Sequence, residues 1–209
     1  MHLPQFEYLR PATLDDALAL LGQAGDKAAI LAGGTDLMAN LSQRLTRAEQ
    51  LISIRSLDEL RGISLADDGA ARIGAGTTLT EIAVHAGLAA AQPLFIDAVN
   101  AVASVHVRNM ATLGGNLALP TRCWYTNQTE TWRNARAGCY KTDRDACHVL
   151  ASSERCVATS SADTVPALIV LDAEVVLQSV RGERRVPLAG FYRNDGAEHI
   201  LRDADELIT

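Results

Sequence analysis

Four thiols stand close together in this chain, and they are the side chains most able to bind a metal. Cys123, Cys139, Cys147 and Cys156 are its only cysteines, and residues 122–156 also hold both tryptophans. The intervals of 15, 7 and 8 residues lack the close cysteine pairs of common zinc modules and the bacterial ferredoxin pattern. A cysteine-ligated iron–sulfur cluster tolerates irregular spacing where the fold gathers four thiolates. The spacing favours a metal or cluster, with inert buried cysteines and disulfides as the alternatives.

The surroundings of these cysteines are basic and aromatic. Six basic residues stand against four acidic ones within residues 122–156. The cations can offset the negative charge of a cluster or can be solvated surface charges. The aromatic rings can shield a cluster or form the small core of the segment. We interpret His148 as a packing or hydrogen-bonding residue. The other residues concerned are Arg122, Arg133, Arg136, Lys141, Arg144 and Arg155, with Trp124, Tyr125, Trp132 and Tyr140.

A compact strand–helix–strand unit is predicted near the N-terminus. Thr13 is placed to cap a helix over "LDDALALL", whose first turn is acidic, as the helix dipole favours. A short buried strand follows at residues 28–31, then a helix over "DLMANLSQRL" and a second strand at "QLISI". Gly33 and Gly34 therefore lie in a turn from strand to helix, where successive backbone N–H groups can converge on an anion.

Further along, residues 63–76 predict a hairpin that turns at Asp68-Gly69, and Thr78 with Glu81 predicts a capping box. A helix is expected over "PLFIDAVNAVAS". "VPALIVLDAEVVLQSVRGERRVPL" predicts two antiparallel strands around Arg181-Gly182. Regular structure thus runs to about residue 118 and resumes near residue 165. We interpret the cysteine segment as a module inserted into a fold that can close without it.

A second glycine pair, in "TLGGN", strengthens the case for an anion site. Two Thr/Gly/Gly loops suggest two clamps on a diphosphate, with Thr112 and Asn116 as side-chain donors. For the first loop, the alternative is that the turn needs glycine only for its backbone angles. The three spaced glycines of the Rossmann fingerprint are absent from that loop.

The composition limits the classes of function. The 209 residues, 48% of them apolar, allow one sizeable domain or two small ones that share an interface. A net charge of -6 argues against nucleic-acid binding, which needs a basic surface. The N-terminal sequence lacks the apolar core of a secretory signal, and no apolar run has the length of a membrane span. We expect a cytoplasmic protein with reduced thiols and no nucleic-acid or membrane partner.

Four motifs, in this order, resemble the flavin-binding subunits of the xanthine dehydrogenase and molybdenum hydroxylase family: "LAGGTDL", "IGAGTTL", "RNMATLGGN" and "SADTVPALIVLDA". The resemblance implies an α+β fold with two FAD-binding α/β subdomains (PCMH / vanillyl-alcohol-oxidase type), at residues 1–57 and 58–209. It also implies that the chain stops where a further C-terminal domain begins in the family. Asp163 would contact the ribose or adenine end of FAD. The residues that the resemblance assigns to FAD are Ala32, Gly33, Gly34, Thr35, Asp36, Thr77, Arg108, Thr112, Gly114, Gly115, Asn116 and Asp163.

Most flavin subunits of the family pass almost directly from "GGN" to the "D-x-x-PAL" segment, whereas here residues 119–160 intervene. In this respect the chain resembles the β subunits of 4-hydroxybenzoyl-CoA reductases, whose inserted loop carries a [4Fe–4S] cluster on four cysteines. The resemblance implies an inserted iron–sulfur module at residues 119–160. It makes Cys123, Cys139, Cys147 and Cys156 the ligands.

These resemblances imply an oxidoreductase subunit with no catalytic acid, base or nucleophile of its own, because the cofactors carry the chemistry. Electrons would come from a ferredoxin-like donor to the cluster, pass to FAD, and continue to a [2Fe–2S] subunit and a molybdenum-cofactor subunit. The implied reaction is the reductive dehydroxylation of 4-hydroxybenzoyl-CoA to benzoyl-CoA. The alternatives are a related molybdenum enzyme with another substrate and a non-catalytic zinc-binding scaffold.

Overall fold

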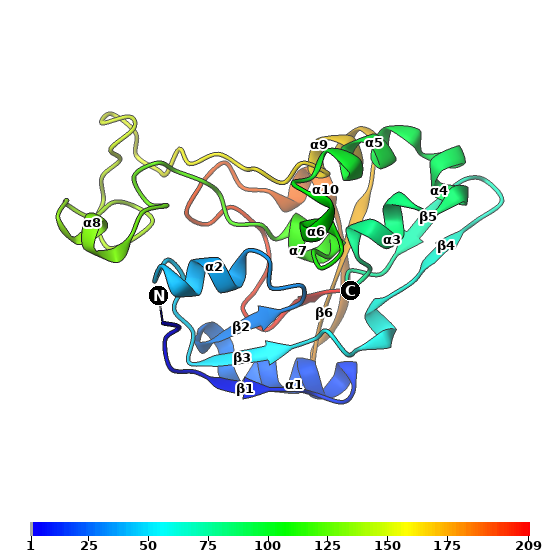
Figure 1. Cartoon of the computed structure of the whole chain (residues 1–209), viewed down its shortest axis with the longest axis horizontal. Coiled ribbons are helices and arrows are strands. Elements are labelled where there is room, and N and C mark those ends of the chain that lie inside the picture. The colour runs from blue at the N-terminus through cyan, green and yellow to red at the C-terminus, as the bar shows by residue number, and fades with distance from the viewer. Residues whose placement is uncertain (1) are drawn as a thin grey trace.

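A three-stranded parallel sheet forms the N-terminal part of the fold (Figure 1); the computed structural model describes residues 2–209. Its strand order is β1-β3-β2, so the strand–helix–strand unit predicted from sequence is confirmed. The Thr13 hydroxyl accepts a hydrogen bond from the backbone N–H of Asp16 at 3.1 Å, which confirms the predicted cap. The elements are β1 (Glu7–Leu9), α1 (Leu14–Ala24), the 3-10 helix η1 (Gly25–Lys27), β2 (Ala28–Leu31), α2 (Leu37–Ser42), β3 (Gln50–Ser53) and the 3-10 helix η2 (Asp58–Leu60).

The rest of the chain forms a hairpin, a second sheet and a series of helices. The hairpin β4-β5 and the capping box of Thr78 and Glu81 agree with prediction. The second sheet is antiparallel, in the order β7-β6-β8. The elements are β4 (Ile63–Leu65), β5 (Ala71–Ile73), α3 (Leu79–Ala83), α4 (Ala86–Ala91), α5 (Pro93–Ala101), α6 (Val105–Arg108), α7 (Leu113–Leu117), α8 (Glu130–Asn134), α9 (Val165–Val170), β6 (Glu174–Ser179), β7 (Gly182–Pro187), α10 (Leu188–Phe191) and β8 (Leu207–Ile208).

Two predictions about local structure are wrong. Residues 165–170 form helix α9 rather than the start of a strand, because a short apolar run fits either state and a proline in its first turn favours the helix. Gly114 and Gly115 lie in the first turn of helix α7 rather than in a loop. The predicted strands around Arg181-Gly182 are confirmed over residues 174–187.

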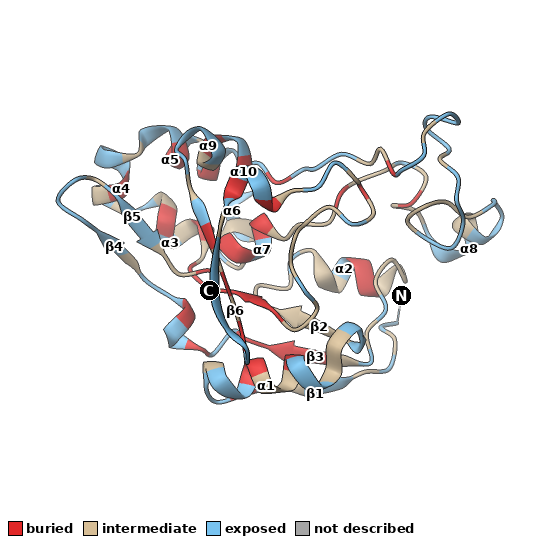
Figure 2. Ribbon diagram, turned by 180° about the vertical axis from the view of Figure 1, so that it is seen from behind, coloured by how far each residue is buried: buried red, intermediate tan, exposed pale blue. Residues whose placement is uncertain are grey.

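Buried apolar side chains form two clusters, and Figure 2 shows buried residues along β3, β6 and α7. The first cluster joins α1 to β3 and η2. The second surrounds the hairpin, α3, α5 and the antiparallel sheet. Strand β8 connects them, because Leu207 belongs to the first cluster and Ile208 to the second. The division of the chain at residue 57 stays a prediction.

The cysteine segment leaves and rejoins the fold at one place. Arg122 and Thr159 exchange two backbone hydrogen bonds, at 2.7 and 3.1 Å, so the two ends of the segment lie side by side. Between them the chain extends away from both apolar clusters, and α8 lies in its outer part (Figure 1). Most of this part is exposed or half-buried (Figure 2). Across residues 2–209, no helix combines the length and apolar character needed to cross a membrane.

Candidate functional site

A cavity of about 630 Å³ lies between the two glycine segments, within the size range of ligand sites. It receives side chains or backbone from β2, from the segment before α7 and from the segment before α9. Ten of the twelve residues predicted to bind FAD line it: Ala32, Gly33, Gly34, Thr35, Asp36, Thr112, Gly114, Gly115, Asn116 and Asp163. The structure therefore brings the two glycine segments to one site.

The two predicted residues that do not line this cavity make internal contacts. The Thr77 hydroxyl accepts from the backbone N–H of Gly62 at 3.0 Å, and the Thr77 carbonyl accepts from the N–H of Leu113. The Arg108 guanidinium donates to the Val102 carbonyl at 2.7 Å. The Arg108 side chain and the Thr77 carbonyl thus hold segments that border the cavity.

Gly33 allows the two glycine segments to touch. A β-carbon at this position would overlap the Met110 carbonyl oxygen and would lie 2.6 Å from the Met110 carbonyl carbon. A second cavity, lined by Arg55, Arg61 and Asn109, shares Ala32, Gly33, Ile54 and Thr112 with the first. The two cavities therefore border one another at these shared residues.

The first glycine segment supplies backbone donors. Within the described chain, the N–H groups of Gly33, Gly34 and Thr35 have no hydrogen-bond acceptor. Gly34 has a φ of 74°, a conformation that favours glycine and turns successive amides in one direction. Helix α2 has only six residues, so these amides matter more than its dipole for binding an anion.

The second glycine segment differs, because its amides are already bonded inside the protein. The N–H of Gly114 donates to the Ala75 carbonyl at 2.8 Å, and the N–H of Gly115 donates to the Thr112 hydroxyl at 3.1 Å. A β-carbon on Gly114 would approach that of Ala75 to 2.8 Å. Gly114 therefore serves close packing, and the second clamp on a diphosphate stays a prediction that depends on the side chains of this segment.

The second glycine segment contributes hydrogen-bonding side chains to the cavity. The Asn116 side-chain oxygen accepts from the Thr164 hydroxyl at 2.6 Å, in a wholly buried contact. This bond fixes the amide, so the NH₂ group of Asn116 stays available to a ligand. The Thr112 hydroxyl, which accepts from Gly115, can donate its own proton in the same way.

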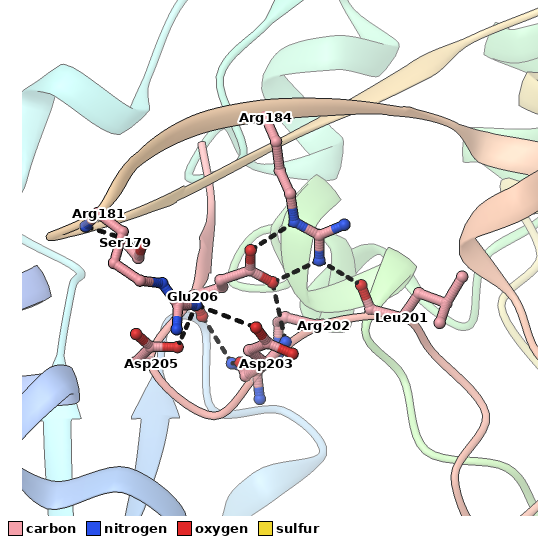
Figure 3. Close-up of polar contacts among 8 residues, drawn as sticks. All are labelled: Ser179, Arg181, Arg184, Leu201, Arg202, Asp203, Asp205 and Glu206. Atoms are coloured by element: carbon pink, nitrogen blue, oxygen red, sulfur yellow. Dashed lines mark hydrogen bonds and ion pairs between the residues drawn. The ribbon is translucent and has the colours of Figure 1, made fainter.

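Two arginines in the cavity were not predicted as part of it. Arg122, which the sequence associated with the cysteines, forms an ion pair with Asp36. Arg202 comes from the C-terminal segment and donates to the carbonyls of Asp203 and Glu206 (Figure 3). Burial lowers the pKa of Arg202 below its usual value, although the neighbouring carboxylates oppose the shift. No sequence motif identifies Arg202, because the fold alone brings it to the glycine segments.

The four cysteines line a second site. Cys123, Cys139, Cys147 and Cys156 all border one small cavity, together with the side chains of Tyr125, Tyr140 and His148. All four are free thiols, and Cys156 is the most buried. In this structure no three His, Cys, Asp or Glu side chains of residues 2–209 form a group that could hold a single metal ion.

The pKa values of two of these thiols shift in opposite directions. Burial alone would raise the pKa of Cys147, but hydrogen bonds from the backbone of Leu150, Val149 and Val157 outweigh it and lower that pKa. Burial raises the pKa of Cys156, against a hydrogen bond from the N–H of Ala158 at 3.4 Å.

Lys141 lies beside the same thiols. Its ammonium donates to the carbonyl and the hydroxyl of Thr121, both at 2.7 Å. Burial lowers its pKa, while Cys156, Cys123 and Cys139 raise it. Lys141 is thus placed to offset negative charge in the cysteine cavity.

The aromatic residues of the segment divide into two groups. Trp124 is 75% exposed, so it does not shield the cysteines. Tyr125 packs against His148 with ring centroids 5.3 Å apart, and the Arg136 guanidinium lies 5.2 Å from the Tyr125 ring and 5.0 Å from the Trp132 ring. Tyr125 and Trp132 are half-buried and Arg136 and His148 are exposed, so these contacts pack the surface of the segment.

Two consecutive residues of the chain line the two cavities, so the cavities are neighbours. Arg122 lines the cavity between the glycine segments, and the next residue, Cys123, lines the cysteine cavity. The backbone pairing of Arg122 with Thr159 holds this point in place.

The first cavity thus combines free backbone amides with two guanidinium groups, a lining that suits an anionic ligand. A model of the "FAD binding domain in molybdopterin dehydrogenase" matches residues 4–209. The chain therefore belongs to this family, and FAD is the cofactor that the match supports.

Relatives and solved structures agree with this assignment. The chain is 31% identical over 196 residues, 94% of its length, to 54% of the xanthine dehydrogenase FAD-binding subunit of Escherichia coli O157:H7. It is 30% identical over 209 residues, 99% of its length, to 57% of the nicotinate dehydrogenase FAD-subunit of Eubacterium barkeri. A chain of the carbon monoxide dehydrogenase from Hydrogenophaga pseudoflava matches all of it, with 28% identity, a TM-score of 0.75 and 58% of that chain covered. The expected α+β fold is confirmed, and the chain spans little more than half the length of these relatives.

Proposed function

We propose that this chain is an electron-transfer subunit that binds FAD between its glycine segments and a [4Fe–4S] cluster on Cys123, Cys139, Cys147 and Cys156. The observation that carries the proposal is that two consecutive residues, Arg122 and Cys123, line the two cavities. Redox groups bound in these cavities would be neighbours, which suits electron transfer without any intervening protein domain.

FAD fits the first cavity through the chemistry of its lining. The unpaired amides of Gly33, Gly34 and Thr35 would bind the pyrophosphate, and the guanidinium groups of Arg122 and Arg202 would balance its charge.

The side chains farther along the cavity would orient the rest of the cofactor. Asn116 and Thr112 would donate from the opposite wall. The carboxylate of Asp163, which also lines the cavity, would accept from a ribose hydroxyl.

The lining of the second cavity suits a cluster, because four thiols border it and backbone amides bond two of the sulfurs. When bound, a [4Fe–4S] cluster would supply one-electron chemistry to the flavin. Hydrogen bonds to cluster sulfurs and nearby charge set the potential of such centres. The amide of Ala158 and the ammonium of Lys141 would perform those two roles here.

The complex around the subunit is inferred from resemblance. We propose partner subunits that carry a molybdenum cofactor and a [2Fe–2S] cluster, a ferredoxin-like electron donor, and a cytoplasmic location that keeps the thiols reduced. The substrate proposed from the cysteine segment is 4-hydroxybenzoyl-CoA, reduced to benzoyl-CoA and water by two electrons and two protons. The inserted module at residues 119–160 belongs to the same proposal.

Cofactor analysis of the anaerobically purified chain tests the proposal. We expect FAD and about four irons per chain, with the broad visible absorption of an iron–sulfur protein. Cys147→Ser should lose the iron. His148→Gln is a matched control, because it changes a neighbouring residue of the same cavity without removing a thiol, and it should keep the iron. Zinc in place of iron would contradict the cluster, and a chain without FAD would contradict the flavin site.

A further inference from the structure

Helix α2, which follows the first glycine segment, is held at its C-terminal end by the cysteine segment. Arg133, in α8, donates through both terminal nitrogens to the Gln43 carbonyl at 3.1 Å and through one of them to the Arg44 carbonyl at 2.9 Å. Gln43 and Arg44 are the two residues that follow Ser42, the last residue of α2, so the guanidinium holds the turn that ends the helix.

The other end of α2 is held from the same segment. Asp36 precedes the first residue of α2, and its carboxylate pairs with Arg122 and accepts from the Asn40 amide at 2.6 Å. Arg122 stands at the base of the cysteine segment, where it pairs with Thr159. Helix α2 is thus braced at one end by Arg122, next to Cys123, and at the other by Arg133 of α8.

The position of Arg133 depends on the cysteines. Helix α8 lies between Cys123 and Cys139, and the apolar clusters of the fold contain no residue of this helix. Ligation of Cys123 and Cys139 to one group would close the loop that carries Arg133 and reduce the number of conformations open to it.

We infer that Arg133 is a positioning residue that couples the two cofactor sites: an ordered cysteine segment holds α2, and α2 holds the amides of Gly33, Gly34 and Thr35 for the FAD pyrophosphate. The inference rests on the proposed function. Coupling between two sites is reciprocal, so bound FAD should stabilise the cluster by the same factor by which the cluster tightens FAD binding.

Arg133→Met removes the brace without touching either cavity lining. Arg133→Lys keeps the stem and the charge but loses the planar fork, so it should fall between the wild type and Arg133→Met. Arg144→Met is the matched control, since Arg144 is an exposed arginine of the same segment whose side chain makes no hydrogen bond or ion pair with residues 2–209.

The FAD dissociation constant, the iron content and the hydrogen exchange of residues 37–45 are measured on the same purified samples. We expect Arg133→Met to keep its iron, to exchange faster over residues 37–45 and to bind FAD about tenfold more weakly. Arg144→Met should match the wild type. Wild-type exchange in Arg133→Met would overturn the brace, and this result is readable whether or not FAD binds.

A double-mutant cycle distinguishes coupling from general damage. Cys147→Ser should also weaken FAD binding, and the double variant should be little weaker than either single variant, because both changes release the same helix. Effects that multiply independently would overturn the route through the cysteine segment. A wild-type chain that binds no FAD would instead contradict the proposed function, while the exchange data would still decide the brace.

Discussion

The contact between Gly33 and Met110 makes the sharpest prediction about the flavin cavity. In Gly33→Ala the added methyl group would lie 2.6 Å from the Met110 carbonyl carbon and 3.1 Å from the Ala111 α-carbon, and it would overlap the Met110 oxygen. These are backbone atoms, which cannot rotate away. The two segments must separate by at least about 1.5 Å to bring the methyl group and the Met110 oxygen to ordinary contact, which displaces donors on both sides of the cavity.

Gly34→Ala is the matched comparison. Its methyl group would meet only the flexible side chains of Leu31 at 3.1 Å and Met38 at 3.4 Å, and its main cost is the left-handed backbone, about 1–2 kcal/mol. Gly33→Ala should cost about 3 kcal/mol or more, because overpacking against a fixed backbone lies at the upper end of such effects. FAD affinity should fall by at least about 100-fold in Gly33→Ala and by about tenfold or less in Gly34→Ala.

Urea unfolding and FAD titration of both variants provide the assay. A Gly33→Ala protein with the stability and FAD affinity of Gly34→Ala would refute the reasoning, because it would mean that the glycine segments do not meet as described.

Two further predictions concern buried polar contacts away from the glycines. Thr164→Val removes the donor to the Asn116 oxygen, so it should lower the unfolding free energy by about 1–2 kcal/mol and weaken FAD binding several-fold. Thr164→Ser keeps the hydroxyl and should match the wild type. Urea unfolding and FAD titration measure the two effects. The hydrogen bonds from Arg184 lower the pKa of Glu206, so the stability from this pair is present above about pH 4.5 and is lost as the pH falls through the folded-state pKa (Figure 3). Glu206→Gln should remove that acid dependence of the unfolding free energy in denaturant titrations from pH 3 to pH 7. It should also lower the unfolding free energy by about 1–2 kcal/mol at pH 7, a modest value because the Arg184 side chain is 45% exposed. An unchanged acid profile would contradict this assignment.

Local signals in the sequence predicted much of the fold. The Thr13 cap, the hairpin turn at Asp68-Gly69 and the capping box at Thr78 each depend on residues within four positions of one another, so the sequence states them directly. The structure of residues 165–170 was predicted wrongly, because their apolar side chains fit a buried strand or a short helix equally well.

The site was predictable only in part, for a physical reason. Glycine pairs mark where a backbone approaches something closely, but not what it approaches. At Gly33 the neighbour is the Met110 carbonyl, and at Gly114 it is Ala75. The contribution of Arg202 depends on a fold contact between the C-terminal segment and the glycine segments, which no local pattern encodes.

The convergence of the cysteines on one cavity also depends on the path of the chain rather than on spacing. The close pairing of Arg122 with Thr159 brings the ends of the segment together, and Cys123 and Cys156 lie beside that pairing. The irregular spacing of the cysteines in the sequence therefore does not predict that they share one cavity.

The central claim is that a flavin and an iron–sulfur cluster are neighbours on this one chain. Electron paramagnetic resonance of the half-reduced protein measures this directly, because a paramagnetic cluster accelerates the spin relaxation of a nearby flavin radical. We predict an iron–sulfur signal together with a flavin radical that resists power saturation, and a flavin radical that saturates readily in Cys147→Ser. A wild-type flavin radical that saturates as readily as the variant's, or a reduced protein without an iron–sulfur signal, would contradict the account.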